Sequence, residues 1–544
     1  MDMELQSRLQ ALSPQINEIC SVSGNAGLSI GVLHHGRVIH RANHGYRDVE
    51  ARLEPDSDTV YHLASLSKFV TSAAVAVLVE EGKMQWESRI ADLLPGFHQK
   101  NEEVEEKANL IDLLGHRLAL EMKVPYWQQM YNQLLLPASE GVNILGALES
   151  VGKFRKDLKY NNWTYGVVGD IIERYSGQSL DDFVKTRLLD PLDLERTSMG
   201  TPASENYTKS YMCLNDGTPY EIPPPSLTSG SIIAASSALK SSINDMLAIY
   251  DSFMKANAHQ REKNTTSTPS SPFAQTKTLL APHITKNKTS YGLGWFLTDL
   301  PGEIGWIGLN EARVKKMPII GRGTSPTSIA YHNGNTPGAL SSVHLIPETH
   351  TAIVVFANSI PFSDIPDWVG GLLLETVLGT PDANDFVALA KEARATAIVK
   401  PAETATLMEK EREKDTPVKP LVDYTGRYYN NIGNFYLDVT VQGDGLRLCV
   451  QGFENTSYDL YHYQHDTFAW ACDREAEVRK AMFPTWYDEF HKIHFAAGDD
   501  NGIDRTIWKH GRDVPAPGET FMKSLDGQPF CWQPSQLNSG FARI

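Results

Sequence analysis

The stretch YHLASLSKFV, residues 61–70, places two serines and a lysine inside an apolar run that continues as TSAAVAVLVEEG. The Ala and Val residues of this run predict a buried helix after Ser65. Residues three positions apart on a helix share a face, so the Lys68 amine is expected to reach the Ser65 hydroxyl, whereas Ser67 points elsewhere. A lysine can take the proton of a serine when burial or nearby cations lower its pKa. Ser65, with Lys68 beside it, is therefore the candidate nucleophile.

The Ser-x-x-Lys spacing by itself is common. The chain contains four matches, which begin at Ser65, Ser150, Ser237 and Ser252. Taken alone, any of these patterns is also compatible with a helix serine beside a solvated lysine. The remaining sequence has to decide between the two interpretations.

Composition narrows the class of protein. With 544 residues the chain is too long for one compact core, so two or three domains are expected. A net charge of −16 and the lack of long basic runs argue against nucleic acid as a partner. The first residues lack the pattern of a signal peptide and no apolar run is long enough to span a membrane, so a cytoplasmic location is expected.

The cysteines and histidines show no spacing typical of a metal site. The five cysteines are scattered, odd in number and without a C-x-x-C pair, which also argues against a disulfide framework: Cys20, Cys213, Cys449, Cys472 and Cys531. The histidines, including the His34–His35 pair and His344, form no H-E-x-x-H pattern. The sequence therefore predicts no metal and no cofactor.

The order of predicted elements suggests two domains. Residues 1–400 form the first, with a strand hairpin turning near Gly36, a helical region at about 62–250, a flexible polar insertion at about 256–276 and later strands. Residues 401–420 are charged and are predicted to be a linker. Residues 421–544 contain short alternating strands typical of an all-β domain.

Strands on both sides of a helical region predict one sheet formed by N-terminal and C-terminal strands, with a helical subdomain inserted between them. This is an α/β (α+β) architecture with an antiparallel sheet flanked by helices. Any site is expected at the seam between sheet and helices.

Two further motifs follow the serine in order. KYNNWTYGVVGDIIE places Tyr160 and Asn162 just before a helix, and YHNGNTPG places His332, Asn333 and Gly334 on a strand edge. Together with the 61–70 stretch they resemble the serine β-lactamase and penicillin-binding-protein superfamily, specifically its class C-like esterase and D-aminopeptidase branch. The resemblance spans about residues 24–380, and the last domain resembles the lipocalin-like barrel of some relatives.

The resemblance implies a role for each motif. Ser65 would be the acylated nucleophile and Lys68 its general base, with the Tyr160 phenol assisting proton transfer. Asn162 would bind Lys68 or the substrate, and His332 and Gly334 of the third motif would face the substrate. The backbone N–H groups of Ser65 and Asn335 would form the oxyanion hole.

Three features of the sequence depart from this pattern or compete with it. The third motif begins with His332 where most relatives have a lysine, which disfavours substrates that need a cation for their carboxylate. Leu118 and Ala119 stand where relatives have a small pair, a Ser or Thr followed by Gly. The nearby Tyr126 and Trp127 either line the pocket or pack in the helical subdomain. GLSIG at 27–31 fits the nucleophile elbow of α/β-hydrolases, but Ser29 lies in a strand pattern and is predicted to be a sheet residue.

Three functions remain open at this stage. The first is a serine hydrolase or acyltransferase of the esterase type. Its Ser65 acyl-enzyme would act on an ester, thioester or amide of a small metabolite, with secondary metabolism or natural-product tailoring as one setting. The second is a D-aminopeptidase or amidase on the same machinery. The third is a catalytically silent binding scaffold. Expected partners are a small acyl substrate and an acyl acceptor or carrier, with the oligomeric state unknown.

Overall fold

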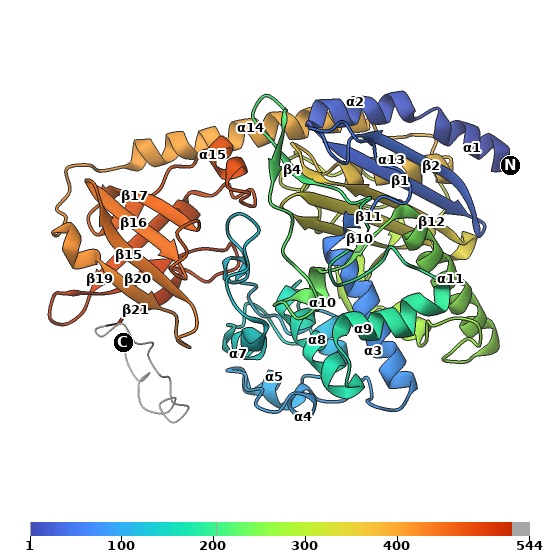
Figure 1. Cartoon of the computed structure of the whole chain (residues 1–544), viewed down its shortest axis with the longest axis horizontal. Coiled ribbons are helices and arrows are strands. Elements are labelled where there is room, and N and C mark those ends of the chain that lie inside the picture. Colours follow the sequence, from blue (N-terminus) through green and yellow to red (C-terminus); the bar gives the residue numbers. More distant parts are fainter. Residues whose placement is uncertain (1, 203, 525–544) are drawn as a thin grey trace.

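The computed structural model describes residues 2–202 and 204–524. Figure 1 shows two bodies: a larger one with a central sheet and helices, and a smaller β-barrel, with the long helix α14 (Phe386–Glu411) running along both. Cys531 and the end of the predicted C-terminal domain lie outside the described residues. None of the described helices is long and apolar enough to cross a membrane.

The larger body is built on one antiparallel sheet in the strand order β2-β1-β12-β11-β10-β9-β8-β7. The predicted hairpin is present, because β1 turns at His35 and Gly36 into β2, and Gly36 supplies the positive φ of 71° that this turn needs. β1 also pairs with β12, in the register Leu28 to Ala357, which joins the two ends of this body. The strands are β1 (Gly27–His34), β2 (Arg37–Gly45), β7 (Ile284–Lys286), β8 (Thr289–Tyr291), β9 (Phe296–Leu300), β10 (Thr327–Thr336), β11 (Ala339–Ile346) and β12 (Thr351–Ala357).

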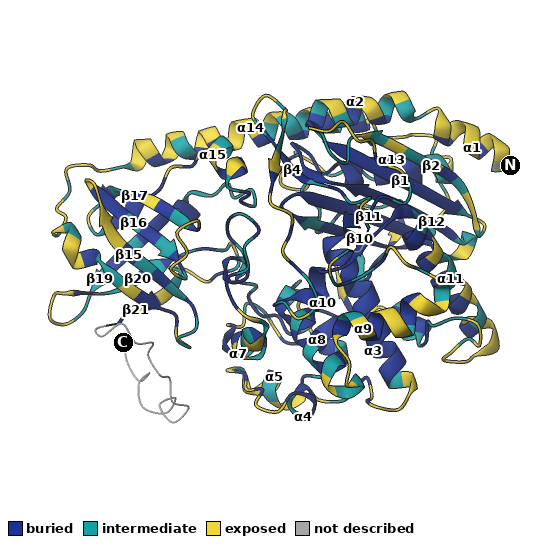
Figure 2. Ribbon diagram, in the orientation of Figure 1, coloured by how far each residue is buried: buried dark blue, intermediate teal, exposed yellow. Residues whose placement is uncertain are grey.

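Helices cover both faces of the sheet, so its central strands are buried throughout (Figure 2). α13 (Ile365–Leu378) packs on β11 and β12, and α1 (Asp2–Gln10) packs on β2 and α13. α2 (Ser13–Ser23) packs on α13 and α14. On the other face, α11 (Ile243–Lys263) packs on β1 and β12. Burial on both faces explains why β1 and β12 are largely apolar.

The inserted region between β2 and β7 is mainly helical, as predicted. α3 (Ser67–Glu80) lies at its centre against α8 (Asn162–Ser176) and α10 (Ala234–Ser237), and small Ala and Val residues permit this burial on all sides. Its other helices are α4 (Ile90–Leu93), α5 (Glu102–Lys107), α6 (Leu110–Leu114), α7 (Gly141–Ala147), α9 (Leu180–Val184) and α12 (Thr276–Leu279), and the short strands are β3 (Tyr61–His62), β4 (Ser210–Cys213), β5 (Pro219–Ile222) and β6 (Lys240–Ser241), with β13 (Ser359–Ile360) beside β4.

The predicted flexible insertion at 256–276 is wrong in its first part, because α11 continues to Lys263. The rest of the segment is fastened by Gln260, whose buried amide donates to the Phe273 carbonyl and accepts from the Thr276 backbone and hydroxyl. The Ser, Thr and Pro content suggested a solvated loop. One buried glutamine and the buried Phe273 order it instead.

The predicted linker at 401–420 also differs from the structure. α14 runs without interruption from Phe386 to Glu411, through Pro401, and so crosses the predicted boundary at 400. Ala390 and Ala393 are buried under the larger body, whereas Met408 packs with barrel residues. A segment with mostly polar residues and few apolar positions resembles a linker in the sequence. In the structure, the first part of this segment belongs to the helix α14, which connects the two bodies.

The smaller body is a closed eight-stranded barrel, which confirms the predicted all-β domain. Its strands are β14 (Gly426–Tyr429), β15 (Tyr436–Gln442), β16 (Gly445–Val450), β17 (Ser457–Gln464), β18 (Thr467–Ala469), β19 (Lys492–Ala497), β20 (Ile503–Trp508) and β21 (Glu519–Lys523). Its interior is aromatic, with Phe468, Phe495 and Trp508 among the buried rings. Between β18 and β19 the chain leaves the barrel to form α15 (Arg474–Arg479), which contacts β4 and β5.

A buried cluster of charged groups joins the two bodies. The Lys123 ammonium donates to Glu519 of β21 at 2.6 Å, and Tyr126 donates to the same carboxylate oxygen at 2.5 Å. The other oxygen of Glu519 bonds to His510 at 2.6 Å. The Tyr126 ring stacks on Phe435 of the barrel, with ring centroids 4.1 Å apart. The barrel therefore docks through specific polar contacts and not only through helix α14.

Candidate active site

Ser65 lies in a 3-10 turn, Ala64–Leu66, directly before α3, rather than on the α-helix itself. Residues i and i+3 are aligned in a 3-10 turn, so Lys68 still lies over Ser65. Ala64 has a positive φ of 46°, an uncommon conformation for a residue other than glycine. Ser67 stabilises the turn, because its hydroxyl donates to the Ala64 carbonyl and accepts from the Leu239 N–H.

The Lys68 amine is completely buried and has three polar neighbours. Its Nζ lies 2.9 Å from Ser65 Oγ, 2.8 Å from Asn162 Oδ1 and 3.1 Å from the Ser236 carbonyl oxygen. Burial lowers the pKa of Lys68 well below its ordinary value. A neutral amine has two N–H groups, which the Asn162 and Ser236 oxygens accept, and its lone pair then faces Ser65. The arrangement suits a base.

Tyr160 approaches Ser65 from the opposite side. It precedes α8, which is capped by the Asn161 side chain, and its hydroxyl lies 2.8 Å from Ser65 Oγ. Burial raises the pKa of Tyr160 above its ordinary value, so the phenol is protonated at neutral pH. Tyr160 is therefore placed as a hydrogen-bond donor to the serine oxygen.

The third motif brings β10 against the serine turn. A Cβ atom on Gly334 would lie 2.3 Å from the Leu63 carbonyl oxygen and 3.1 Å from the Ser65 backbone nitrogen, so only glycine fits there. The next residue, Asn335, lines the cavity in front of Ser65, and its side chain donates to the Ile307 carbonyl at 2.9 Å. Gly334 therefore allows β10 to approach the serine turn closely.

The side chain of His332 has different surroundings from those that its motif suggests. Its ring is buried, and Nε2 lies 3.1 Å from the Tyr291 hydroxyl while Nδ1 lies 2.7 Å from the Asn333 carbonyl. Burial and the nearby Lys68 lower the pKa of His332 to about 3, so the ring is neutral. Among the described residues that line the cavity, His332 is not included. Its ring packs near Tyr160, with the two ring centroids 6.0 Å apart.

Ser65 opens into a cavity of about 330 Å³ whose described lining contains no charged side chain. Its wall comes from the helical region, from β10 and from the barrel side of the molecule. The lining residues are Ser65, Met122, Val124, Trp127, Gln128, Gln129, Tyr160, Asn162, Leu227, Ile233, Ser237, Ile307, Asn335, Thr336, Pro337 and Phe483. A pocket of this size and composition suits a small, uncharged organic group.

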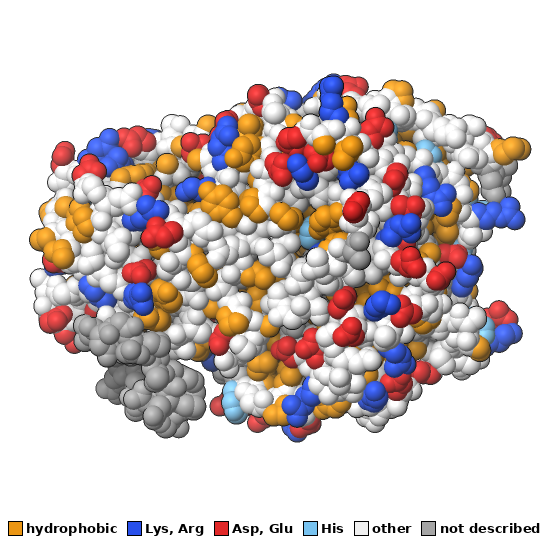
Figure 3. Space-filling view, in the orientation of Figure 1, with side chains coloured by type: hydrophobic (Ala, Val, Ile, Leu, Met, Phe, Trp, Pro, Cys, Tyr) orange, Lys and Arg blue, Asp and Glu red, His pale blue; other side chains and the backbone are white. Residues whose placement is uncertain are grey.

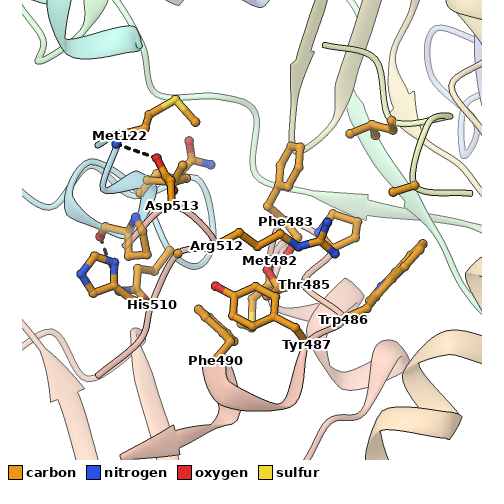
Figure 4. Close-up of a pocket in the computed structure, with 18 of the residues that line it drawn as sticks. Met122, Met482, Phe483, Thr485, Trp486, Tyr487, Phe490, His510, Arg512 and Asp513 are labelled. Carbon is orange, nitrogen blue, oxygen red and sulfur yellow. Dashed lines mark hydrogen bonds between the residues drawn. The ribbon is translucent and has the colours of Figure 1, made fainter. Parts of the chain in front are cut away.

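A second cavity of about 370 Å³ adjoins the first and lies between the two bodies. The two share the lining residues Met122, Val124, Gln128, Gln129 and Phe483. Figure 4 shows Met122, whose N–H donates to Asp513, across from the segment Met482–Tyr487. This segment follows α15, so the smaller body contributes directly to the space in front of Ser65. We call it the cavity segment.

Several residues of the site escaped the sequence analysis. Ser237 lines the cavity although its Ser-x-x-Lys match looked accidental, and the neighbouring Ser236 carbonyl contacts Lys68. Phe483 could not be found because its place depends on how the barrel docks. The prediction for Ser29 is confirmed, since it lies in β1 and bonds to Asn43 and Tyr61.

The sequence left open whether Tyr126 and Trp127 line the pocket or pack in the helical subdomain, and the structure gives each residue a different place. Trp127 lines the cavity and packs on Trp163, whereas Tyr126 points to Glu519 and the barrel.

On the face shown in Figure 3, basic and acidic side chains of the described residues are interspersed without a continuous basic stripe.

Comparisons with known proteins agree with this geometry. The beta-lactamase family matches residues 19–372, and a domain of unknown function (DUF3471) matches residues 410–528. Protein flp of Staphylococcus aureus (strain MW2) is 22% identical over 340 residues, which is 61% of this chain and 59% of that protein. The chain therefore spans less than two thirds of the length of protein flp.

Two solved structures share the fold. The octameric penicillin-binding protein homologue from Pyrococcus abyssi is 19% identical, with a TM-score of 0.56 over 94% of this chain and 99% of that one. The class C beta lactamase from Rhodobacter sphaeroides is also 19% identical, with a TM-score of 0.51 over 72% of this chain and 99% of that one. With more than half of its residues matched, the chain belongs to the beta-lactamase family, within the superfamily of serine β-lactamases and penicillin-binding proteins.

Proposed function

We propose that this protein is a serine hydrolase or acyltransferase of the esterase type that works through an acyl-enzyme on Ser65. The observation that carries the proposal is the position of Ser65 Oγ between Lys68 Nζ at 2.9 Å and the Tyr160 hydroxyl at 2.8 Å, at the wall of a cavity. A hydroxyl with a base on one side and a proton donor on the other is suited to nucleophilic attack.

In the proposed reaction the Ser65 oxygen attacks the carbonyl carbon of an ester, thioester or amide while Lys68 takes the serine proton. The carbonyl oxygen becomes negative and is stabilised by the backbone N–H groups of Ser65 and Asn335. Collapse of this intermediate expels the alcohol, thiol or amine, which receives a proton through Tyr160. Asn162 keeps Lys68 in place, and Gly334 allows β10 to approach the serine.

The acyl-enzyme is then resolved by a second nucleophile. Water gives hydrolysis, whereas an acceptor alcohol or amine gives transfer, and the same lysine removes the proton of either. The second cavity supports transfer, because it adjoins the first, shares five lining residues with it and has room for a separate molecule.

The cavity also limits the acyl group. Its described lining lacks a charged residue, and His332, which replaces the cation of most relatives, is neutral and turned toward Tyr291. A substrate carboxylate would find no ionic partner there, and burying one without a partner is costly. We therefore propose neutral, mostly apolar acyl groups, with a small metabolite in the cytoplasm as the substrate.

The test is intact-protein mass spectrometry after brief exposure to a fluorophosphonate and, separately, to a short-chain aryl ester. We expect one adduct on the wild-type protein and none on Ser65→Ala. The matched control is Ser252→Ala, since Ser252 and Lys255 repeat the same spacing on α11, where Lys255 instead pairs with Asp251.

Retention of the adduct in Ser65→Ala would refute the assignment of the nucleophile. Absence of any adduct on the wild-type protein would favour the silent scaffold. A preference for D-configured amides over simple esters would favour the amidase, and rapid turnover of a cephalosporin carrying a carboxylate would contradict the proposed neutral acyl group.

A further inference from the structure

Three side chains with metal-binding atoms converge in the smaller body, away from Ser65. Cys472 lies two residues before α15, Glu477 lies on α15, and His491 ends the 3-10 helix Asp488–His491 before β19. The thiol sulfur, a carboxylate oxygen and a ring nitrogen all lie within 4.8 Å of one another, and His491 Nε2 is 4.0 Å from Glu477 Oε1.

These three groups are buried and largely without partners. Cys472 and Glu477 are each 8% exposed, and His491 is 0% exposed. Glu477 Oε1 and both ring nitrogens of His491 form no hydrogen bond of good geometry among the described residues, and the polar group that His491 contacts is the Thr485 backbone. Buried polar atoms are nearly always paired, because leaving them unpaired costs free energy, so a missing partner has to be sought.

We propose that Cys472, Glu477 and His491 bind one zinc ion. Thiolate, imidazole and carboxylate are the ligand types that zinc prefers, and zinc accepts three protein ligands with a water in the fourth position. Ligand atoms around a tetrahedral zinc lie about 3.3 to 3.8 Å apart, so the three side chains need to approach one another by about 1 Å. Rotation of the Glu477 and Cys472 side chains is sufficient for such a movement.

The charged side chains around the cluster leave the Glu477 carboxylate few partners other than a bound ion. The charged groups that act on Glu477 are Asp473, Arg474 and Lys480. Arg474 is already occupied, since its guanidinium donates to Asn215 and to the Cys213 carbonyl. Trp470 packs on His491, with ring centroids 5.6 Å apart, and keeps the imidazole in a fixed orientation.

The position of the site gives the ion a structural consequence. The cavity segment, Met482–Tyr487, lies between Glu477 and His491 in the chain, and it supplies Phe483 to the cavity of Ser65. An ion held by Glu477 and His491 would fasten both ends of this segment, and Cys472 would tie it to the start of α15. Closing a loop in this way restricts its conformations. α15 contacts β4 and β5 of the larger body, and the 3-10 helix Asp488–His491 contacts α14.

The sequence spacing gave no sign of this site, because the three ligands, although all within residues 472–491, follow no C-x-x-C or H-x-x-x-H pattern. Zinc binding by these three residues and acylation of Ser65 are independent properties of the protein, and either can occur without the other.

The test is metal analysis of the untagged full chain, first as purified and then after chelation and addition of zinc or cobalt. We expect one equivalent of zinc per chain. We also expect the Co²⁺ form to show thiolate-to-cobalt charge-transfer absorption together with the intense visible bands of tetrahedral cobalt. Cys472→Ser should abolish the charge-transfer absorption, and Glu477→Gln should weaken zinc binding at least about tenfold.

Cys449→Ser is the matched control, because Cys449 lies on β16 of the same barrel and outside the cluster. It should retain both the zinc and the cobalt spectrum. Failure of the wild-type protein to bind zinc, or a Co²⁺ spectrum without thiolate absorption, would overturn the proposal even if the variants failed to fold. Binding that survives both Cys472→Ser and Glu477→Gln would overturn it as well.

Discussion

Replacing Glu519 with glutamine should weaken the attachment of the barrel by an amount that depends on pH. The carboxylate is buried and accepts hydrogen bonds from Lys123, Tyr126 and His510. Although burial alone would raise its pKa, the Lys123 and His510 contacts lower the pKa of Glu519 from 4.5 to about 2. Such a change corresponds to about 3 kcal/mol of folding free energy at neutral pH.

The sign of the pH dependence follows from the direction of this change. A group whose pKa is lower in the folded state stabilises the fold at a pH above its unfolded value. That contribution is lost as the pH falls from about 4.5 toward 2. Glutamine keeps the shape of the side chain but has no charge. The difference in free energy of unfolding between wild type and Glu519→Gln should therefore be about 3 kcal/mol at pH 7 and should decrease below pH 4.5.

The assay is urea unfolding at a series of pH values, followed by tryptophan fluorescence and by the hydrogen exchange of β21. Glu454→Gln is the control, because Glu454 is on the same barrel with its side chain 87% exposed, and its loss should change stability by less than about 0.5 kcal/mol. A difference between wild type and Glu519→Gln below about 1 kcal/mol at pH 7, or one that does not change with pH, would refute the reasoning.

Three further predictions concern the site itself. Lys68→Ala should lower the rate of Ser65 acylation by about 10²- to 10⁴-fold, measured by stopped-flow release of an aryl alcohol, and an unchanged rate would exclude Lys68 as the base. In the wild-type protein that rate should rise with pH through the lowered pKa of Lys68, since the base must be neutral; a flat profile in Lys68→Ala is the matching control. Gly334→Ala should lower the rate of acylation about 10²-fold or more, because the new Cβ would lie 2.3 Å from the Leu63 carbonyl oxygen and would push β10 away from the serine turn; near wild-type activity would show that β10 can move away without harm.

Local sequence was sufficient where a feature depends on neighbouring residues. The hairpin at Gly36, the apolar helix after Ser65 and the alternating strands of the barrel each follow from short patterns. The order of three motifs then indicated which serine to examine. The family relationship could therefore be predicted from the sequence.

Features that depend on the docking of distant segments could not be predicted. His332 sits in its motif at the expected position of β10, but its ring turns toward Tyr291, which no local pattern reveals. Phe483 reaches the cavity only because α15 and the barrel pack on the larger body. Segment 256–276 was misjudged because a single buried side chain, Gln260, outweighs the polar composition of its neighbours.

The pairing of β1 with β12 has a consequence for how the chain is made. Leu28 and Ala357 are partners in the sheet, yet the ribosome adds about 5 to 20 residues per second, so β1 waits on the order of tens of seconds for its neighbour. During that time the hairpin of β1 and β2 presents an apolar strand with unpaired backbone groups, a form prone to aggregation. Folding of the sheet is thus expected to be slow and to rely on chaperones that protect the nascent hairpin, whereas the intervening helices can form earlier from local contacts.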